Sequence, residues 1–173
     1  MDNIVLIGMP GAGKSTIGVI LAKVLGYRFI DTDLLIQEQE NRLLKDIIET
    51  EGLTCFLDIE GEVVKNLVTD YSVIATGGSV IYRQAAMEHL KNHGILVYIR
   101  LNYGTINSRL GNIKSRGVVL KDGQSLYSLY EERCPLYEQY ADIIIDAEEL
   151  SMEELMEEIK DEVHKFRSFK ENR

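Results

Sequence analysis

The chain has 173 residues, 45% of them hydrophobic, which is enough for one compact domain with a sizeable core. Its 19 basic and 28 acidic residues give a net charge of −9, which disfavours nucleic-acid binding because that binding depends on Lys and Arg side chains that neutralise phosphates. No apolar run has the length of a membrane span or a signal peptide, so we expect a cytoplasmic protein with no membrane partner, whose two cysteines are unpaired thiols.

Strand-like and helical patterns alternate along the chain. In chain order, the predicted strands lie at residues 4–7, 27–30, 73–75, 95–99 and about 143–145. The predicted helices lie at residues 17–25, 43–52, 56–67 and about 86–94, followed by a short helix ending near Leu110, one that precedes Pro135, and a last one opened by the capping box of Ser151 and Glu154.

This alternation predicts a doubly wound α/β fold, in which helices cover both faces of a parallel sheet. Residues 1–166 should form a single domain, and 167–173 a flexible tail. Residues 111–124 are polar and contain glycines, so we treat them as a candidate lid. Ligands bind at the carboxyl ends of the strands in such sheets, where the glycine-rich and acidic segments of this chain are expected.

The segment Gly8-Met9-Pro10-Gly11-Ala12-Gly13-Lys14-Ser15 matches the P-loop pattern, directly after a predicted strand and at the start of a predicted helix. Its backbone N–H groups would surround phosphates, Lys14 would offer a cation, and the Ser15 hydroxyl would ligate Mg²⁺. The residues expected to bind ATP here are Gly11, Ala12, Gly13, Lys14, Ser15 and Thr16. A P-loop alone does not separate a kinase from a GTPase or an ATPase.

Asp31 and Asp33 follow the second predicted strand. In an extended segment both side chains point the same way, so one carboxylate can hold the Mg²⁺ shell while the other accepts a hydrogen bond from an acceptor hydroxyl. The alternative is that Thr32 or Asp33 only caps the next helix.

Cations are expected around the candidate lid, since an anionic transition state on an acidic protein needs them. Arg109, Arg116 and Arg133 bracket this segment, although each could equally be a solvated surface group. His89 and His93 stand four residues apart, but no further ligands accompany them, which favours surface histidines over a metal site.

Five ordered segments together resemble the shikimate kinase family over about residues 3–160. They are residues 8–15, Phe29-Ile30-Asp31-Thr32-Asp33, residues 56–60, Thr76-Gly77-Gly78, and Arg133-Cys134-Pro135-Leu136-Tyr137. The resemblance implies a P-loop NTPase fold with a five-stranded sheet in the order 2-3-1-4-5, a lid, and an acceptor-binding helical region at about 33–62. It also implies a monomer that phosphorylates shikimate to shikimate 3-phosphate with ATP and Mg²⁺, in aromatic amino-acid biosynthesis.

The resemblance assigns roles to individual residues. By this likeness, Lys14 and Ser15 serve the phosphates and Mg²⁺, Asp31 supports the metal, and Asp33 contacts the acceptor hydroxyls. Arg116 would be the lid arginine and Arg109 would lie against adenine. The shikimate carboxylate would be held by Arg133, and the acceptor pocket lined by Gly77 and Gly78.

Three departures from the family pattern lie near the acceptor. Leu57 stands where the family has an arginine for the substrate carboxylate, Ser79 replaces the third glycine of a Gly-Gly-Gly corner, and the lid segment reads Arg116-Gly117-Val118-Val119-Leu120. An aliphatic side chain cannot replace a bidentate guanidinium contact. The candidates for a replacement cation are Arg83, Lys114 and Lys121.

The sequence therefore favours a shikimate kinase, with two alternatives. One is a kinase of the same fold that acts on another small polyol or hydroxy acid, as Leu57 and Ser79 suggest. The other is a regulatory module that binds nucleotide without acceptor chemistry. A GTPase is less favoured, because the sequence lacks an Asn-Lys-x-Asp guanine-specificity segment.

Overall fold

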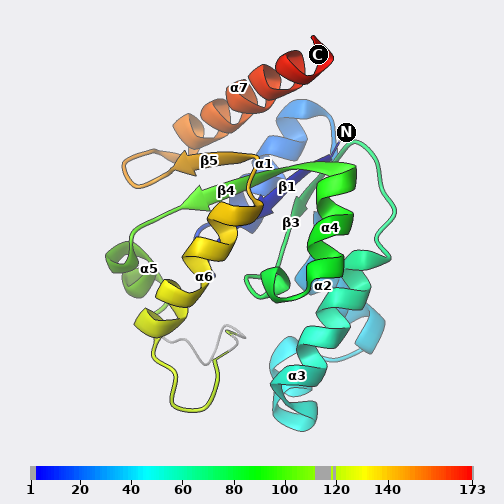
Figure 1. Cartoon of the computed structure of the whole chain (residues 1–173), viewed down its shortest axis with the longest axis vertical. Coiled ribbons are helices and arrows are strands. Elements are labelled where there is room, and N and C mark those ends of the chain that lie inside the picture. The colour runs from blue at the N-terminus through cyan, green and yellow to red at the C-terminus, as the bar shows by residue number, and fades with distance from the viewer. Residues whose placement is uncertain (1–2, 112–117, 119, 173) are drawn as a thin grey trace.

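The computed structural model describes residues 3–111, 118 and 120–172. At its centre lies a five-stranded parallel sheet in the order β2-β3-β1-β4-β5 (Figure 1). The strands are β1 (Asn3–Ile7), β2 (Arg28–Asp31), β3 (Ser72–Ala75), β4 (Gly94–Arg100) and β5 (Ile143–Asp146). The predicted fold class and strand order are confirmed.

Helices cover both faces of this sheet. α1 (Lys14–Leu25) and α7 (Met152–Glu171) contact each other on one face, whereas α4 (Gln84–His93) and α6 (Leu126–Tyr140) lie on the other (Figure 1). Every residue of the central strand β1 is buried, as expected for a parallel strand covered on both sides. The remaining helical segments are α2 (Thr32–Glu40), α3 (Leu44–Lys65), α5 (Tyr103–Arg109) and the short 3₁₀ turn η1 (Val80–Tyr82).

α2 and α3 extend from the sheet as a helical pair that encloses a second, smaller hydrophobic cluster. The cluster consists of Ile36, Ile47, Phe56 and Val63. α3 bends at Gly52, whose φ of 84° lies in the left-handed region that glycine adopts without a steric penalty. The non-helical backbone of Gly52 thus divides α3 into two helical parts, as predicted.

The extended segment predicted at Asp31 and Asp33 is wrong. The chain turns into α2 directly after β2, and Asp31 is the N-cap, whose Oδ1 accepts a hydrogen bond from the backbone N–H of Asp33 at 3.0 Å. Capping satisfies a helical N–H that would otherwise lack a partner, so the strand can pass into a helix without a loop. The apolar pattern predicted no separate helix here, although the resemblance implies a helical region at about 33–62.

Two helix ends also differ from the predictions. α6 continues through Pro135, although proline removes one backbone hydrogen bond of the helix. The buried side chains of Leu129, Arg133 and Tyr137 anchor the helix on both sides of this position. The segment from residue 167, predicted as a flexible tail, belongs to α7, which is helical to Glu171. Arg167 fixes this last turn because it donates to the Tyr27 hydroxyl at 3.2 Å and lies over the Tyr27 ring.

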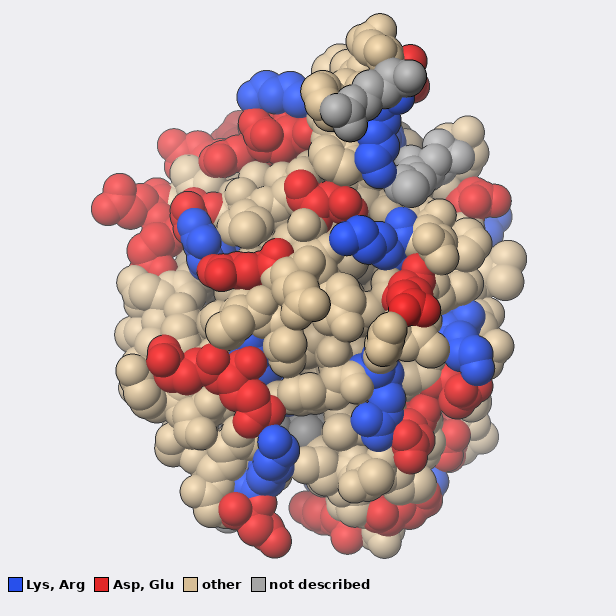
Figure 2. All heavy atoms as spheres, viewed as in Figure 1, with Lys and Arg blue, Asp and Glu red and all other residues tan. Residues whose placement is uncertain are grey.

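Charged side chains of both signs are interspersed on the face shown in Figure 2. Several of these charges form ion pairs, of which the pair between Arg100 and Asp146 joins the ends of β4 and β5 at 2.5 Å. None of the helices in the described part of the chain has the length and apolar character that crossing a bilayer requires.

Candidate active site

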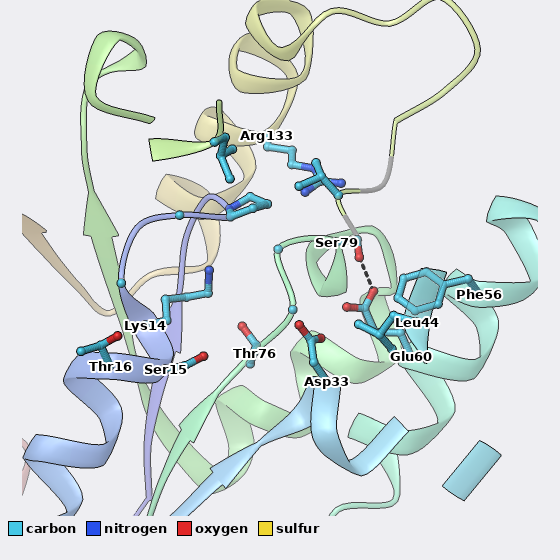
Figure 3. Close-up of a pocket in the computed structure, with 17 residues that line it drawn as sticks. Lys14, Ser15, Thr16, Asp33, Leu44, Phe56, Glu60, Thr76, Ser79 and Arg133 are labelled. Atoms are coloured by element: carbon cyan, nitrogen blue, oxygen red, sulfur yellow. Dashed lines mark hydrogen bonds between the residues drawn. The ribbon is translucent and has the colours of Figure 1, made fainter. Parts of the chain in front are cut away.

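A cavity of about 260 Å³ opens at the carboxyl ends of the strands. Its lining comes from the P-loop, α2, α3, the corner after β3, and α6 (Figure 3). Because the strands are parallel, the segments that follow β1, β2 and β3 meet at one edge of the sheet. The site is thus assembled from distant parts of the sequence, as predicted.

The P-loop forms the floor of this cavity on the side of α1. Gly13 is the N-cap of α1, and its φ of 93° is a left-handed conformation that favours glycine. No side chain caps this helix end, so the first-turn N–H groups of α1 stay available for an anion. Five of the six predicted nucleotide-binding residues line the cavity, and Ala12 is buried behind it.

Lys14 lies over the loop that precedes it. Its ammonium donates to the backbone carbonyls of Gly8 and Met9 at 2.8 and 2.9 Å, and only 8% of the residue is exposed. Burial lowers the pKa of Lys14 to about 8, although the nearby carboxylate of Asp33 opposes the shift. The ammonium is therefore a poorly hydrated cation at the cavity wall (Figure 3), suited to bind phosphate.

The hydroxyl of Ser15 and the carboxylate of Asp31 contact each other at the N-terminus of α1. Ser15 Oγ donates to Asp31 Oδ2 at 2.7 Å, while Asp31 Oδ1 caps α2. The helix cap that the sequence analysis placed at Thr32 or Asp33 is thus Asp31, whose other carboxylate oxygen faces the P-loop serine. The described residues contain no cluster of three or more His, Cys, Asp or Glu side chains that would hold a metal.

Asp33 points into the cavity from the first turn of α2 (Figure 3). Burial raises the pKa of its carboxyl to about 6, the negative charge of Asp31 adds to this effect, and Lys14 opposes it. A carboxylate with a raised pKa that faces a ligand cavity is suited to accept a hydrogen bond from a hydroxyl.

The corner after β3 brings backbone close to these carboxylates. The Gly77 N–H donates to the Thr32 hydroxyl at 3.1 Å. A Cβ on Gly77 would lie 2.2 Å from Glu60 Oε1 and 2.8 Å from Asp33 Oδ1, so a side chain there would require both carboxyl groups to move. Gly78 is similarly enclosed, because a Cβ there would lie 3.0 Å from Arg133 Nη1. Both predicted corner glycines line the cavity.

Glu60 is a site residue to which sequence reasoning gave no role. It is fully buried on α3, its Oε2 accepts a hydrogen bond from Ser79 Oγ at 2.7 Å, and its Oε1 has no hydrogen-bond partner among the described residues (Figure 3). Burial raises its pKa to about 7. The signal in the sequence that could have found it was the departure of Leu57 and Ser79 from the family pattern.

Arg133 reaches the cavity from α6 and is 1% exposed. The two described candidates for a replacement cation are themselves ion-paired, Arg83 with Asp58 at 2.7 Å and Lys121 with Glu132 at 3.1 Å. Lys114 lies outside the described residues.

The two other predicted arginines are Arg109 and Arg116. Arg109 is exposed and donates to the Gly11 carbonyl at 3.2 Å, so it stands over the P-loop. Arg116 lies outside the described residues, as does half of the predicted lid segment. Their roles at adenine and at the transferring phosphate stay predictions.

Side chains that were given no chemistry also have structural partners. Cys55 and Cys134 are free thiols. His89 Nε2 contacts the Leu67 carbonyl at 2.7 Å, and His93 Nδ1 contacts the His89 carbonyl at 2.8 Å, contacts that suit histidines at a helix end better than metal ligands.

Comparison with known proteins agrees with this geometry. The family model described as shikimate kinase matches residues 10–164. A shikimate kinase of Thermodesulfovibrio yellowstonii is 38% identical over 163 residues, which cover 92% of this chain and 93% of that protein. One of Clostridium botulinum strain Eklund 17B is 38% identical over 161 residues, which cover 92% and 95%.

The solved structures include a shikimate kinase from Acinetobacter baumannii in complex with shikimate. It superposes with a TM-score of 0.88 at 32% identity, covering 95% of this chain and 94% of that one. Since the family model spans most of the chain and these relatives are matched over nearly their whole length, the chain belongs to the shikimate kinase family.

Proposed function

We propose that this protein transfers the γ-phosphate of ATP to a hydroxyl of shikimate, forming shikimate 3-phosphate. The observation that carries the proposal is the single cavity in which Lys14 and Ser15 of the P-loop face Asp33 and Arg133. The cavity thus combines a cation and a hydroxyl that can bind a nucleotide with a carboxylate that can bind an acceptor hydroxyl and a guanidinium that can bind an acid. The relative from Acinetobacter baumannii, solved with shikimate, supports the choice of acceptor.

Each group has a part in the reaction that its surroundings support. The P-loop N–H groups and Lys14 bind the phosphates and stabilise the charge that develops during transfer. Asp33 accepts a hydrogen bond from the attacking hydroxyl and orients it in line with the γ-phosphate. Arg133 binds the shikimate carboxylate, and the Gly77 and Gly78 backbone lies against the ring. Arg116 and Arg109 keep their proposed roles at the γ-phosphate and adenine.

The donor set of Ser15 and Asp31 fits Mg²⁺. This ion takes oxygen ligands, keeps several waters, and is usually bound by one or two protein groups together with substrate phosphates, so a larger carboxylate cluster is not required. When bound with ATP, Mg²⁺ would neutralise phosphate charge. Ser15 Oγ and the Asp31 carboxylate, which contact each other at 2.7 Å, are the groups that would hold it.

The test is ADP formation by the purified protein with ATP and Mg²⁺, with and without saturating shikimate. Stimulation by shikimate that is lost in Lys14→Ala and Asp33→Asn, and retained in the surface control Lys23→Ala, would support the proposal. Stimulation by another polyol or hydroxy acid alone would favour the second kinase hypothesis. ATP binding without stimulation by any acceptor would favour a regulatory module.

The other expectations from the sequence stay predictions. They are the cytoplasmic location, the monomeric state and the lack of nucleic-acid binding, and sedimentation of the purified protein would test the second of them.

A further inference from the structure

The guanidinium of Arg133 is held from one side by Tyr82. Arg133 Nε donates to the Tyr82 hydroxyl at 3.2 Å, and its Cζ lies 5.3 Å from the centroid of the Tyr82 ring. Nη1 lies beside Gly78, which lines the cavity. Tyr82 therefore binds the guanidinium through Nε, while Nη1 is the nitrogen next to the corner after β3.

The direction of hydrogen bonding at Tyr82 is fixed by a third residue. The Tyr82 hydroxyl is 2.5 Å from Glu132 Oε1. An ionised carboxylate only accepts, so the single Tyr82 proton goes to Glu132, and the phenol oxygen must accept from Arg133. The bond to Tyr82 lowers the pKa of Glu132, so this carboxylate is charged at neutral pH.

Glu132 is held in turn by two residues at the end of the predicted lid segment, Lys121 and Gln124. Lys121 Nζ approaches its two oxygens at 3.1 and 3.2 Å, and Gln124 Nε2 donates to Oε2 at 3.0 Å. Residues 132 and 133 are adjacent on α6, so their side chains leave the helix in different directions and Tyr82 joins them. The hydrogen bonds thus run from Arg133 through Tyr82 to Glu132, where Lys121 and Gln124 also meet.

This arrangement matters because the chain has Leu57 where the family has a second arginine for the substrate carboxylate. One guanidinium that must bind a carboxylate with directional hydrogen bonds loses affinity if it rotates, and no second arginine at position 57 shares the contact. Arg133 Nε donates to the neutral phenol of Tyr82, and the Glu132 carboxylate lies on the far side of that phenol. The hydrogen bond therefore orients Arg133 without placing Glu132 in direct contact with it.

We infer that Tyr82 and Glu132 are positioning residues that orient Arg133 toward the carboxylate of the acceptor, with Glu132 acting through Tyr82. This inference rests on the proposed function for its kinetic test, and the hydrogen bonds supply a second test that needs no acceptor.

The kinetic test compares Tyr82→Phe, Glu132→Ala and the double variant. Tyr82→Phe should raise the KM for shikimate about 5- to 20-fold and leave kcat and the KM for ATP within about twofold of wild type, because one hydrogen bond to a charged group is lost. Glu132→Ala should have a smaller effect of the same kind and add nothing in the Tyr82→Phe background, because it acts through the phenol. Tyr127→Phe and Glu131→Ala, both exposed, are the matched controls.

An unchanged KM for shikimate in Tyr82→Phe would overturn the inference. So would a Glu132→Ala effect that is fully additive, or a joint fall of kcat and both affinities together with the melting temperature, which would show a merely structural role.

The second test is the NMR signal of the Arg133 Nε–Hε group in ¹⁵N-labelled protein without ligands, assigned through Arg133→Lys. In wild type this proton should exchange slowly, and in Tyr82→Phe the signal should shift and exchange faster. An unaltered signal would overturn the inference. If shikimate failed to stimulate the wild type, the proposed function would fall and this measurement alone would decide the inference.

Discussion

The Ser15 hydroxyl donates a 2.7 Å hydrogen bond to the Asp31 carboxylate, which joins the first turn of α1 to the cap of α2. Ser15 follows β1 and Asp31 ends β2, two strands that β3 separates in the sheet, and the two residues are the donor set to which we assign Mg²⁺. Their contact shows that the two oxygens already lie close together in the protein alone.

Ser15→Ala should therefore reduce kcat by about a hundredfold or more, because a hydroxyl ligand at a phosphoryl-transfer site is lost. Ser15→Thr keeps the hydroxyl and should retain most activity. The measurement is turnover as a function of Mg²⁺ concentration, where Ser15→Ala should need more Mg²⁺ for half-maximal rate. Ser168→Ala, which removes a distant hydroxyl on α7, is the control, and an Mg²⁺ dependence equal to wild type in Ser15→Ala would contradict the assignment.

Lys14→Met should abolish turnover and stabilise the fold. Burial lowers the Lys14 pKa from 10.5 to about 8, so the folded state binds fewer protons than the unfolded state between these values, and stability rises with pH across that window. Below pH 8 the charged lysine destabilises the fold in full, on the order of 3 kcal/mol for this shift. Removal of the charge should raise the free energy of unfolding by up to that amount at pH 7.

Urea denaturation at pH 7 and pH 10.5 checks this prediction. The gain of Lys14→Met over wild type should shrink toward zero at the higher pH, where the lysine is neutral in the folded state and half of it is neutral in the unfolded state. Lys23→Met, exposed in the last turn of the same helix, should show no such change. A Lys14→Met protein that is less stable than wild type at pH 7 would show that the bonds to Gly8 and Met9 outweigh the cost of burial.

Glu60→Gln should raise stability at pH 8 and have little effect at pH 5. Burial raises the Glu60 pKa to about 7, so the folded state holds a proton that the unfolded state releases above 4.5. Stability is then lost as pH rises from 4.5 toward 7, by on the order of 3 kcal/mol. Asp33, whose pKa is raised to about 6, contributes in the same direction and remains in the variant, so the dependence is reduced and not abolished.

Free energies of unfolding at the two pH values test the Glu60 prediction, with the exposed Glu62→Gln as control. Equal losses of stability between pH 5 and 8 in Glu60→Gln and wild type would mean that Glu60 is ionised in the folded state. Ser79 would then be its main source of stabilisation, through the bond of 2.7 Å.

Gly77→Ala should weaken acceptor binding selectively. The added methyl would meet Glu60 Oε1 at 2.2 Å and Asp33 Oδ1 at 2.8 Å, so both carboxyl groups must move. The KM for shikimate should rise by about tenfold or more, since displacement of a positioning group by even a fraction of an ångström costs transition-state alignment. The affinity for ATP, measured by calorimetry, should stay within about twofold.

Gly111→Ala is the matched control, because its nearest neighbour to an added Cβ is 4.0 Å away. If Gly77→Ala lost ATP affinity as strongly as acceptor affinity, the corner after β3 would belong to the nucleotide site and not to the acceptor site.

Local patterns in the sequence determined the P-loop, the strands and the capping box at Ser151, because the residues of each lie next to one another in the chain and fix their own backbone geometry. The resemblance added the strand order and the convergence of Lys14, Asp33, Gly77 and Arg133 at one edge of the sheet. The errors occurred where one residue changes the local geometry, as at Asp31, whose cap begins a helix where an extended segment was expected.

Only the tertiary structure decided which polar side chains meet across long separations. Glu60 and Ser79 are 19 residues apart, and Tyr82 and Arg133 are 51 apart. The hydrophobic periodicity of the sequence does not predict such contacts, because they depend on how α3 and α6 lie against the corner after β3. The loss of an arginine at position 57 was visible in the sequence, but the buried Glu60 and the Tyr82 hydroxyl beside Arg133 appear only once the chain is folded, since burial and hydrogen-bond geometry are properties of the packed molecule.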